Sequence, residues 1–327
     1  MAWLTSALYK VHPIFILSAL LSSLSHLEIV MAPSTKLFFL DFGLSNMKNG
    51  KLSGRILTCD EQGENLSTVI DGFPAMPGIT QNRIYYTSMG NPTSNNGYIS
   101  RLNLDGENHE VIVPQGVTFT PKQLQVVPEH GKIYWCDREG MRVFRCNLDG
   151  SDVEVLVTTG ETDQNRKDPR NWCVGIAVDP DRRRMYWTQK GPSKGNQGRL
   201  FTSSLEISPG ETSGTRSDIK LLLYRLPEPI DLDLDFEENV LYLTDRADPP
   251  FGNSISRVEL DPKKKLEKKI LVRRLHEAIG LSLDLENRKM YFTDLLGALY
   301  KSDMDTSNEK VLFSDLGDLT GVTCLHG

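Results

Sequence analysis

The sequence predicts an all-β fold: a six-bladed β-propeller with four-stranded antiparallel blades, its ring closed by a C-terminal strand that completes blade one. Three observations predict this fold. A short apolar motif occurs six times, its copies start 47 to 56 residues apart, and each repeat divides into four strand-like segments. Such regular self-similarity is the sequence sign of a repeat architecture. The six copies are 37–41 (LFFLD), 84–88 (IYYTS), 133–137 (IYWCD), 185–189 (MYWTQ), 241–245 (LYLTD) and 290–294 (MYFTD).

The fourth repeat shows the division into strands most clearly. Its segments are 174–179, 185–188, 198–205 and 219–224, with a polar turn after the first and a Gly-rich loop after the second. β-Branched and aromatic residues dominate these segments, as is typical of strands in a pleated, half-buried sheet. Asp-Gly pairs in other repeats supply tight turns between the third and fourth strands. No segment after residue 31 has a sustained helical period.

The two ends of the repeat array predict how the ring closes. The first repeat lacks its own first strand before Leu37, whereas 319–325 is an extra segment that matches 174–178. Pairing these two parts would complete blade one and remove the open edge of a linear array. We therefore expect that deleting 318–327 opens the ring and abolishes cooperative folding.

The repeated motif resembles the YWTD (class B) repeats of the low-density-lipoprotein receptor propellers. The best matches are 134–137 (YWCD), 186–189 (YWTQ) and 291–294 (YFTD), and the resemblance covers about residues 35–327. It implies a YWTD-type six-bladed propeller over 31–327. Cys-rich growth-factor modules and a transmembrane helix are not seen in the sequence, which favours a stand-alone propeller over a receptor.

The composition and the N-terminal segment limit the kinds of partner and the cellular compartment that we expect for this chain. The net charge of −6 argues against a nucleic-acid partner, and five cysteines without metal-ligand spacing do not make a disulfide framework. Cys136 and Cys146 fall on neighbouring predicted strands, where they would either form a disulfide or remain as buried thiols. The apolar run 13–24 makes 1–30 a signal-like or disordered leader and is too short to span a membrane. The chain then enters the secretory pathway, or is cytoplasmic if Met31 is the true start.

The loop lengths predict where a ligand binds. Loops from strand two to three, and from strand four to the next blade, share one face of a propeller and are long here, whereas the turns on the other face are short. Long loops on a rigid scaffold concentrate function, so we expect a small-molecule site at the loop-rich mouth of the central channel. As catalytic candidates we name His276, Arg246 and Arg138, and as substrate-binding candidates Trp172, Gln189, Asp41, Asp245 and Met76. The mouth is also expected to include Ser88, Asp137 and Asp294.

Each candidate also has a structural interpretation. The motif aspartates would fix local turns and neighbouring blades, and Trp172 would pack beside the channel. His276 ionises near neutral pH when free, which suits acid–base chemistry, but it would also suit a solvated surface. No G-x-S-x-G elbow, P-loop or H-E-x-x-H motif is present in the sequence.

Three functions remain open. The opening 36–45 (KLFFLDFGLS) and the degenerate repeats resemble a small group of fungal propellers, the hetero-Diels–Alderases of tropolonic sesquiterpenoid biosynthesis. That resemblance implies a cofactor-free, metal-free cyclase joining a tropolone quinone methide to a humulene-type alkene. The receptor resemblance implies instead a non-catalytic protein- or ligand-binding propeller. The third function is that of a metal-dependent lactonase- or esterase-like propeller. For each of the three functions, the sequence leaves the oligomeric state open.

Overall fold

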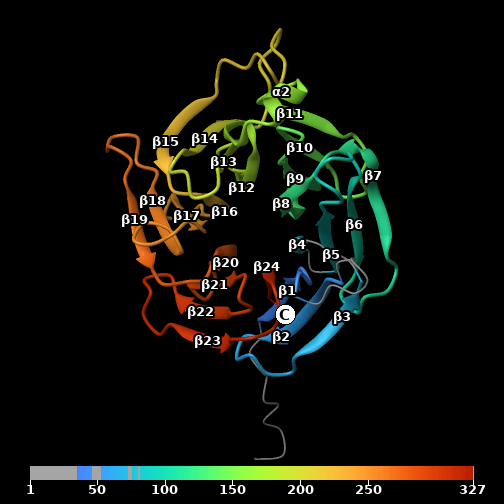
Figure 1. Cartoon of the computed structure of the whole chain (residues 1–327), viewed down its shortest axis with the longest axis vertical. Helices are drawn as coiled ribbons and strands as arrows, with labels where there is room; N and C mark the ends of the chain where they lie inside the picture. Colours follow the sequence, from blue (N-terminus) through green and yellow to red (C-terminus); the bar gives the residue numbers. More distant parts are fainter. Residues whose placement is uncertain (1–34, 46–52, 73–75, 80–81, 327) are drawn as a thin grey trace, which may run out of the picture. The chain divides into compact units, whose positions relative to one another are not determined.

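A computed structural model describes residues 35–45, 53–72, 76–79 and 82–326, and of 76–79 it describes the backbone only. The leader expected over 1–30 and the alternative start at Met31 lie outside the described residues. The predicted fold class is confirmed. Six four-stranded antiparallel sheets form a ring around a central channel, as Figure 1 shows.

Each blade uses four strands that follow one another in sequence, except the first. Blade two is β4 (Met76–Ile79) to β7 (Glu110–Thr118), with β5 (Arg83–Ser88) and β6 (Gly97–Asn103) between; blade three is β8 (Pro121–Val127), β9 (Lys132–Asp137), β10 (Arg142–Asn147) and β11 (Glu154–Thr158); blade four is β12 (Cys173–Asp179), β13 (Arg184–Gln189), β14 (Gly198–Ser204) and β15 (Lys220–Leu226). Blade five is β16 (Pro229–Asp235), β17 (Val240–Asp245), β18 (Ser254–Glu259) and β19 (Lys268–Val272); blade six is β20 (Ala278–Asp284), β21 (Lys289–Asp294), β22 (Leu299–Asp303) and β23 (Lys310–Phe313).

Blade one confirms the predicted ring closure. Its order is β24 (Leu319–Leu325), β1 (Lys36–Asp41), β2 (Arg55–Asp60) and β3 (Ser67–Asp71), so the last strand in sequence is the innermost strand of the first blade. β24 runs antiparallel to β1 with Leu37 opposite Cys324. The hydrogen bonds of this pair therefore join the first and last repeats.

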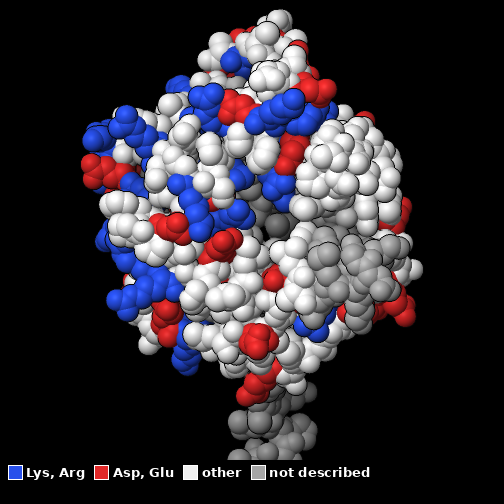
Figure 2. Space-filling model, in the orientation of Figure 1, with Lys and Arg blue, Asp and Glu red and all other residues white. Residues whose placement is uncertain are grey.

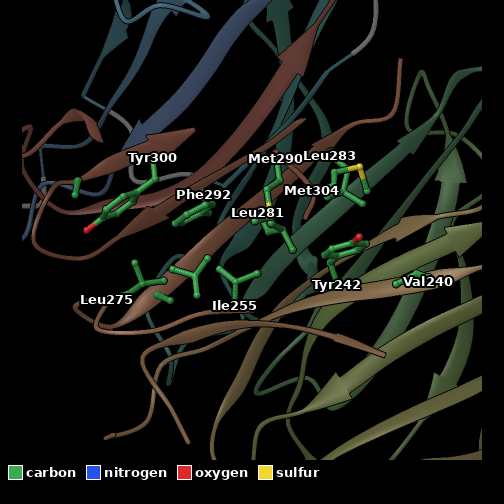
Figure 3. Close-up of a cluster of buried hydrophobic side chains, with 13 residues drawn as sticks. Val240, Tyr242, Ile255, Leu275, Leu281, Leu283, Met290, Phe292, Tyr300 and Met304 are labelled. Atoms are coloured by element: carbon green, nitrogen blue, oxygen red, sulfur yellow. The ribbon is translucent and has the colours of Figure 1, made fainter. Parts of the chain in front are cut away.

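Buried aromatic and aliphatic side chains hold neighbouring blades together. Figure 3 shows one such cluster, in which Tyr242 and Ile255 of blade five pack against Met290 and Phe292 of blade six. In blade three the motif residue Trp135 is fully buried and stacks on Phe144 with ring centroids 4.9 Å apart. The motif aromatics are thus core residues, and they are not available to a ligand.

The motif aspartates tie the loops of the channel mouth to the blades. Asp137 accepts hydrogen bonds from the backbone N–H groups of Phe119 and Thr120, which lie in the loop leading into β8, and it forms an ion pair with Arg142. Asp294 likewise accepts from the backbone N–H of His276, in the loop before β20. A carboxylate that receives several backbone N–H groups satisfies donors that would otherwise be buried without a partner.

Some details differ from the sequence prediction. The connection between blades two and three is shorter than the long loop expected from strand four to the next blade. The reason is that β7 continues to Thr118, which pairs with Gly97 across an irregular register. The long loop between β11 and β12 contains a one-turn helix, α2 (Asp163–Arg166), which starts with a capping box between Thr162 and Asn165. All five cysteines are free, so Cys136 and Cys146 are not bridged.

Candidate functional site

An outer ring of side chains shapes a cup at the loop-rich end of the channel. In every blade, the residue that directly follows the motif contributes to the wall of a cavity of about 190 Å³. These residues are Phe42, Met89, Arg138, Lys190, Arg246 and Leu295. In five of them the backbone N–H donates a hydrogen bond to a backbone carbonyl in the loop before the first strand of the same blade, which fixes the residue's position. The donor and acceptor pairs are Phe42 and Asp318, Arg138 and Thr120, Lys190 and Trp172, Arg246 and Glu228, and Leu295 and His276.

An inner ring of side chains forms the floor of the cup. The first strand carries a β-bulge in blades one, three, four, five and six. In each of these strands, the bulge lies two residues before the residue that pairs with the third residue of the motif copy. A bulge re-aims a side chain, and here one residue at the bulge of each strand lines the cup, joined in blade three by the adjacent Gln123. The floor residues are Thr320, Lys122, Val174, Ile230 and Ile279.

The cup is two-sided. Blades three, four and five contribute Arg138, Lys190 and Arg246, whereas blades six, one and two contribute Leu295, Phe42 and Met89. We call the first set the cationic arc and the second set the apolar arc. Figure 2 shows Lys and Arg side chains gathered on one side of the central hollow, over the green to orange blades of Figure 1.

Two buried carboxylates partly neutralise the cationic arc. Glu228 is fully buried and lies 2.7 Å from Lys190 Nζ and 2.9 Å from Arg246 Nε. Burial raises the pKa of Glu228, but Lys190 and Arg246 outweigh burial and lower it overall. Glu139 pairs with Arg138 Nε at 2.7 Å. Glu277 adds a longer contact, 4.0 Å from Arg246, at the rim.

Lys122 on the floor lacks such a partner. Its side chain is 8% exposed, its Nζ lies 2.8 Å from the sulfur of Met89, and no carboxylate of the described residues is within ion-pair distance. Burial, together with the nearby Arg138 guanidinium, lowers the pKa of the Lys122 amine well below its ordinary value. The adjacent residue Gln123 is buried, and neither atom of its amide has a hydrogen-bond partner among the described residues.

Trp172 lies behind the cationic arc. Its ring faces Arg138 at 5.1 Å and Lys190 at 5.6 Å, and its indole N–H donates to the Arg166 carbonyl at 2.8 Å. Cation–π contacts of this kind hold a cation against a ring face. Trp172 therefore orients two of the cup's cations, and the residues that line the cavity do not include it.

The sequence-predicted residues divide into two groups. Arg138 and Arg246 line the cup, as expected of mouth residues, and His276 is an exposed rim residue 3.6 Å from Asp294. Met76 opens β4, but its side chain lies outside the described residues. The sequence reasoning missed Lys122, Lys190, Glu139 and Glu228.

The other predicted substrate contacts do not line the cup. Asp41 is fully buried and accepts hydrogen bonds from Gly43, Asp318 and Arg55. Asp245 is fully buried, accepts from the backbone of Glu228, and has its pKa raised to about 6 by burial. Gln189 is buried at the motif's last position and pairs with Cys173. All three side chains are buried within the blades, outside the lining of the cup.

A second hollow opens toward the opposite end of the channel. It has a volume of about 310 Å³ and is lined by Gln123, Asp231, Asp233 and apolar residues of the first strands. Burial raises the pKa of Asp231 well above its ordinary value and that of Asp233 to about 6. Among the described residues, no group of three or more His, Cys, Asp or Glu side chains converges as a metal site. None of the described helices has the length and apolarity needed to cross a membrane.

Known proteins share this architecture and part of the sequence. The chain matches no protein-family model. It is 44% identical over 307 residues to the Pyricularia oryzae protein named low-density lipoprotein receptor-related protein 1, covering 89% of this chain and 98% of that protein. It is 40% identical over 238 residues to the Cochliobolus heterostrophus protein named 3-hydroxyacyl-CoA dehydrogenase-like protein LAM1, covering 70% of this chain but only half of that protein.

A solved structure agrees with the fold. A chain in the crystal structure of a nidogen/laminin complex superposes with a TM-score of 0.66 over 89% of this chain and 98% of that chain, at 18% identity. That degree of identity shows the fold alone. The motif, the blade order and the 44% identity to a fungal homologue over nearly its whole length agree with this fold. The chain therefore belongs to the family of YWTD-type propellers that includes the Pyricularia oryzae low-density lipoprotein receptor-related protein 1.

Proposed function

We propose that this propeller is a small-molecule cyclase of the hetero-Diels–Alderase kind, which joins a tropolone quinone methide to a humulene-type alkene at the channel mouth. The observation that carries the proposal is the two-sided cup. Its cationic arc offers hydrogen-bond donors to the oxygen-bearing ring, and its apolar arc offers a surface to the hydrocarbon.

The arrangement suits the chemistry of a cycloaddition. A hydrogen bond donated to the carbonyl oxygen of the heterodiene draws electron density toward that oxygen and makes the carbon end of the diene more electrophilic. Arg138 and Arg246 have side chains that are 20% and 29% exposed, so their charges act from a partly dehydrated site. The reaction needs no nucleophile, and it gains from holding two partners in near-attack geometry.

The size of the cup limits how much of the two substrates can enter it. Its volume of about 190 Å³ is smaller than the roughly 300–1,000 Å³ typical of drug-sized ligand pockets. In this proposal the tropolone ring enters the cup, and the alkene extends over Phe42 and Leu44, of which Leu44 is 47% exposed. His276, on the rim, contacts the part of the substrate that remains outside.

The test compares the catalysed reaction with the spontaneous one. Purified protein is mixed with a precursor of the tropolone quinone methide and a humulene-type alkene, and product formation and stereochemistry are followed by chiral chromatography. We expect acceleration and one dominant stereoisomer. Arg246→Leu, which copies the equivalent Leu295 of blade six, should slow the reaction about 100-fold. Lys194→Leu, on an exposed lysine paired with Asp248 outside the cup, serves as the matched control. An unchanged rate and an unchanged isomer ratio with the wild-type protein would overturn the proposal.

A non-catalytic binding propeller is the second candidate, favoured by the name of the Pyricularia oryzae relative. In that case the cup would bind a ligand and release it unchanged. Binding of the two cyclase substrates without turnover, measured by calorimetry and product analysis on the same sample, would favour this candidate.

A further inference from the structure

Lys122 stands at a position where the fold does not need a charge. The equivalent floor residues of blades four, five, six and one are Val174, Ile230, Ile279 and Thr320, which occupy the same bulge and line the same cup. Four sister blades therefore build this position without an amine. A lysine is costly to bury without a partner, so its presence in blade three calls for a role in the cup.

The groups that face Lys122 favour an uncharged amine. Arg138, Lys190 and Arg246 contribute positive charge, and all three oppose protonation of Lys122. Glu139 favours protonation, but it is already paired with Arg138, and Glu228 is shared by Lys190 and Arg246. With Lys122 uncharged, the three cations of the cationic arc face two closely paired carboxylates, and one positive charge remains to hold an anion.

Gln123 is a second, independent sign of a polar ligand. Its side chain is 5% exposed, its amide oxygen and nitrogen both lack partners among the described residues, and it borders both hollows of the channel. Buried amides are normally hydrogen-bonded, so an unpartnered one next to Lys122 points to a polar group that the cup receives.

We propose that Lys122 accepts a proton from an acidic hydroxyl of the bound ligand, an enol- or phenol-type group on a planar ring. The ligand's O–H bond breaks, an N–H bond forms at Nζ, and the ring oxyanion stays between the new ammonium group and the cationic arc. The proton moves from the ligand to the amine inside the cup, so this step leaves the total charge of cup and ligand unchanged. The inference rests on the proposed function for its ligand class, but it concerns binding and protonation and not cyclisation.

Tropolone alone is the probe, because its neutral and anionic forms have different absorption spectra. The experiment is done at a pH where free tropolone is mostly protonated. We expect wild-type protein to give the spectrum of the anion and Lys122→Ile, which copies Ile230 and Ile279, to lose this shift and to bind at least about tenfold more weakly. Melting temperatures of the two proteins should agree within a few degrees, because the sister blades fold with isoleucine at this position.

Lys122→Arg separates proton acceptance from simple charge attraction. Its guanidinium is always protonated, so it can hold an anion but cannot accept a proton. Its affinity for tropolone should fall as the pH is lowered through the ligand's own pKa, whereas wild-type affinity should fall much less. A neutral spectrum in the wild-type complex, absence of tropolone binding, or an anion spectrum retained in Lys122→Ile would overturn the inference.

The same variants distinguish this inference from the cyclase proposal. If tropolone binds as the anion through Lys122 but no cyclisation is accelerated, proton acceptance stands and the cyclase proposal fails. If the wild type accelerates cyclisation but Lys122→Ile still binds tropolone as the anion, the cyclase proposal stands and the role of Lys122 fails.

Discussion

The hydroxyl of Thr87 donates a hydrogen bond of 2.8 Å to the carbonyl oxygen of Lys122, across the boundary between blades two and three. The same bond joins Thr188 to Ile230, Thr244 to Ile279 and Thr293 to Thr320, at 3.4, 2.9 and 3.3 Å. In each case the threonine of one blade's motif fixes the floor residue of the next blade. The motif thus controls the shape of the cup although its own side chains are buried.

Thr244 gives the sharpest test of this linkage. Its buried hydroxyl accepts from the Asp231 N–H and donates to the Ile279 carbonyl, both at 2.9 Å. Thr244→Val keeps the shape but leaves two buried backbone groups without a partner, so we expect about 2–3 kcal/mol of lost stability in urea unfolding. Thr244→Ser keeps the hydroxyl and should lose about 1 kcal/mol. Equal losses in the two variants would contradict the proposed role of the hydrogen bonds.

Gly175 tests how closely the blades approach at the floor of the cup. A Cβ at this position would lie 2.2 Å from the backbone carbonyl oxygen of Ile230 in blade five. Gly175→Ala must push the two blades apart, and we expect a loss of about 1–3 kcal/mol. Gly214→Ala is the matched control, because its nearest atom would be a Glu161 side-chain oxygen at 3.6 Å. Thermal unfolding of both variants decides the matter, and a stable Gly175→Ala would disprove the close contact.

Trp172 should affect ligand binding more than stability. Trp172→Leu removes the ring that faces Arg138 and Lys190, so both cations gain freedom that binding must then restrict. We expect tropolone affinity to fall about tenfold, which corresponds to about 1.4 kcal/mol. Trp172→Phe keeps a ring but loses the bond to the Arg166 carbonyl, and its effect should be smaller. A larger loss for phenylalanine than for leucine, measured by calorimetry, would contradict this order.

Asp218 predicts a pH-dependent contribution to stability. It pairs with the buried side chain of Arg216, whose hydrogen bonds lower the pKa of Asp218 from 3.8 to about 2. Because the folded-state pKa is the lower one, the contribution of about 2 kcal/mol is present above pH 4 and is lost as the pH falls toward 2. Asp218→Asn should therefore be less stable at pH 7, with the difference from wild type shrinking below pH 4.

The control for that series is Asp163→Asn, since Asp163 is 93% exposed and lies 3.5 Å from Arg166. Its stability should follow the wild type at every pH. A difference between Asp218→Asn and wild type that stays constant from pH 7 to pH 3 would rule out the linkage.

Much of the fold could be predicted from the sequence because the repeat makes its phase visible. The motif located the second strand of every blade, and the unmatched segment 319–325 located the closing strand. The end of β7 was less predictable, because its irregular pairing with β6 depends on the neighbouring strand and leaves no period in the sequence.

The cup was predictable only in part. Arg138 and Arg246 were found because they stand beside motif aspartates, and Lys190 was missed because its blade carries Gln189 in place of the aspartate. Reading the residue after every motif copy would have found the whole outer ring. Lys122 depends on a β-bulge that turns its side chain into the channel, and a bulge has no signature in one sequence.

The pairing of β24 with β1 has a consequence for synthesis. β1 is synthesised before blades two to six and β24 after them, so the inner edge of blade one waits without its partner while those blades emerge from the ribosome. Thr320, which belongs to the cup floor, arrives on that final strand. The ring and the floor of the cup are therefore completed in the same late event, and a chain that stops before β24 has neither.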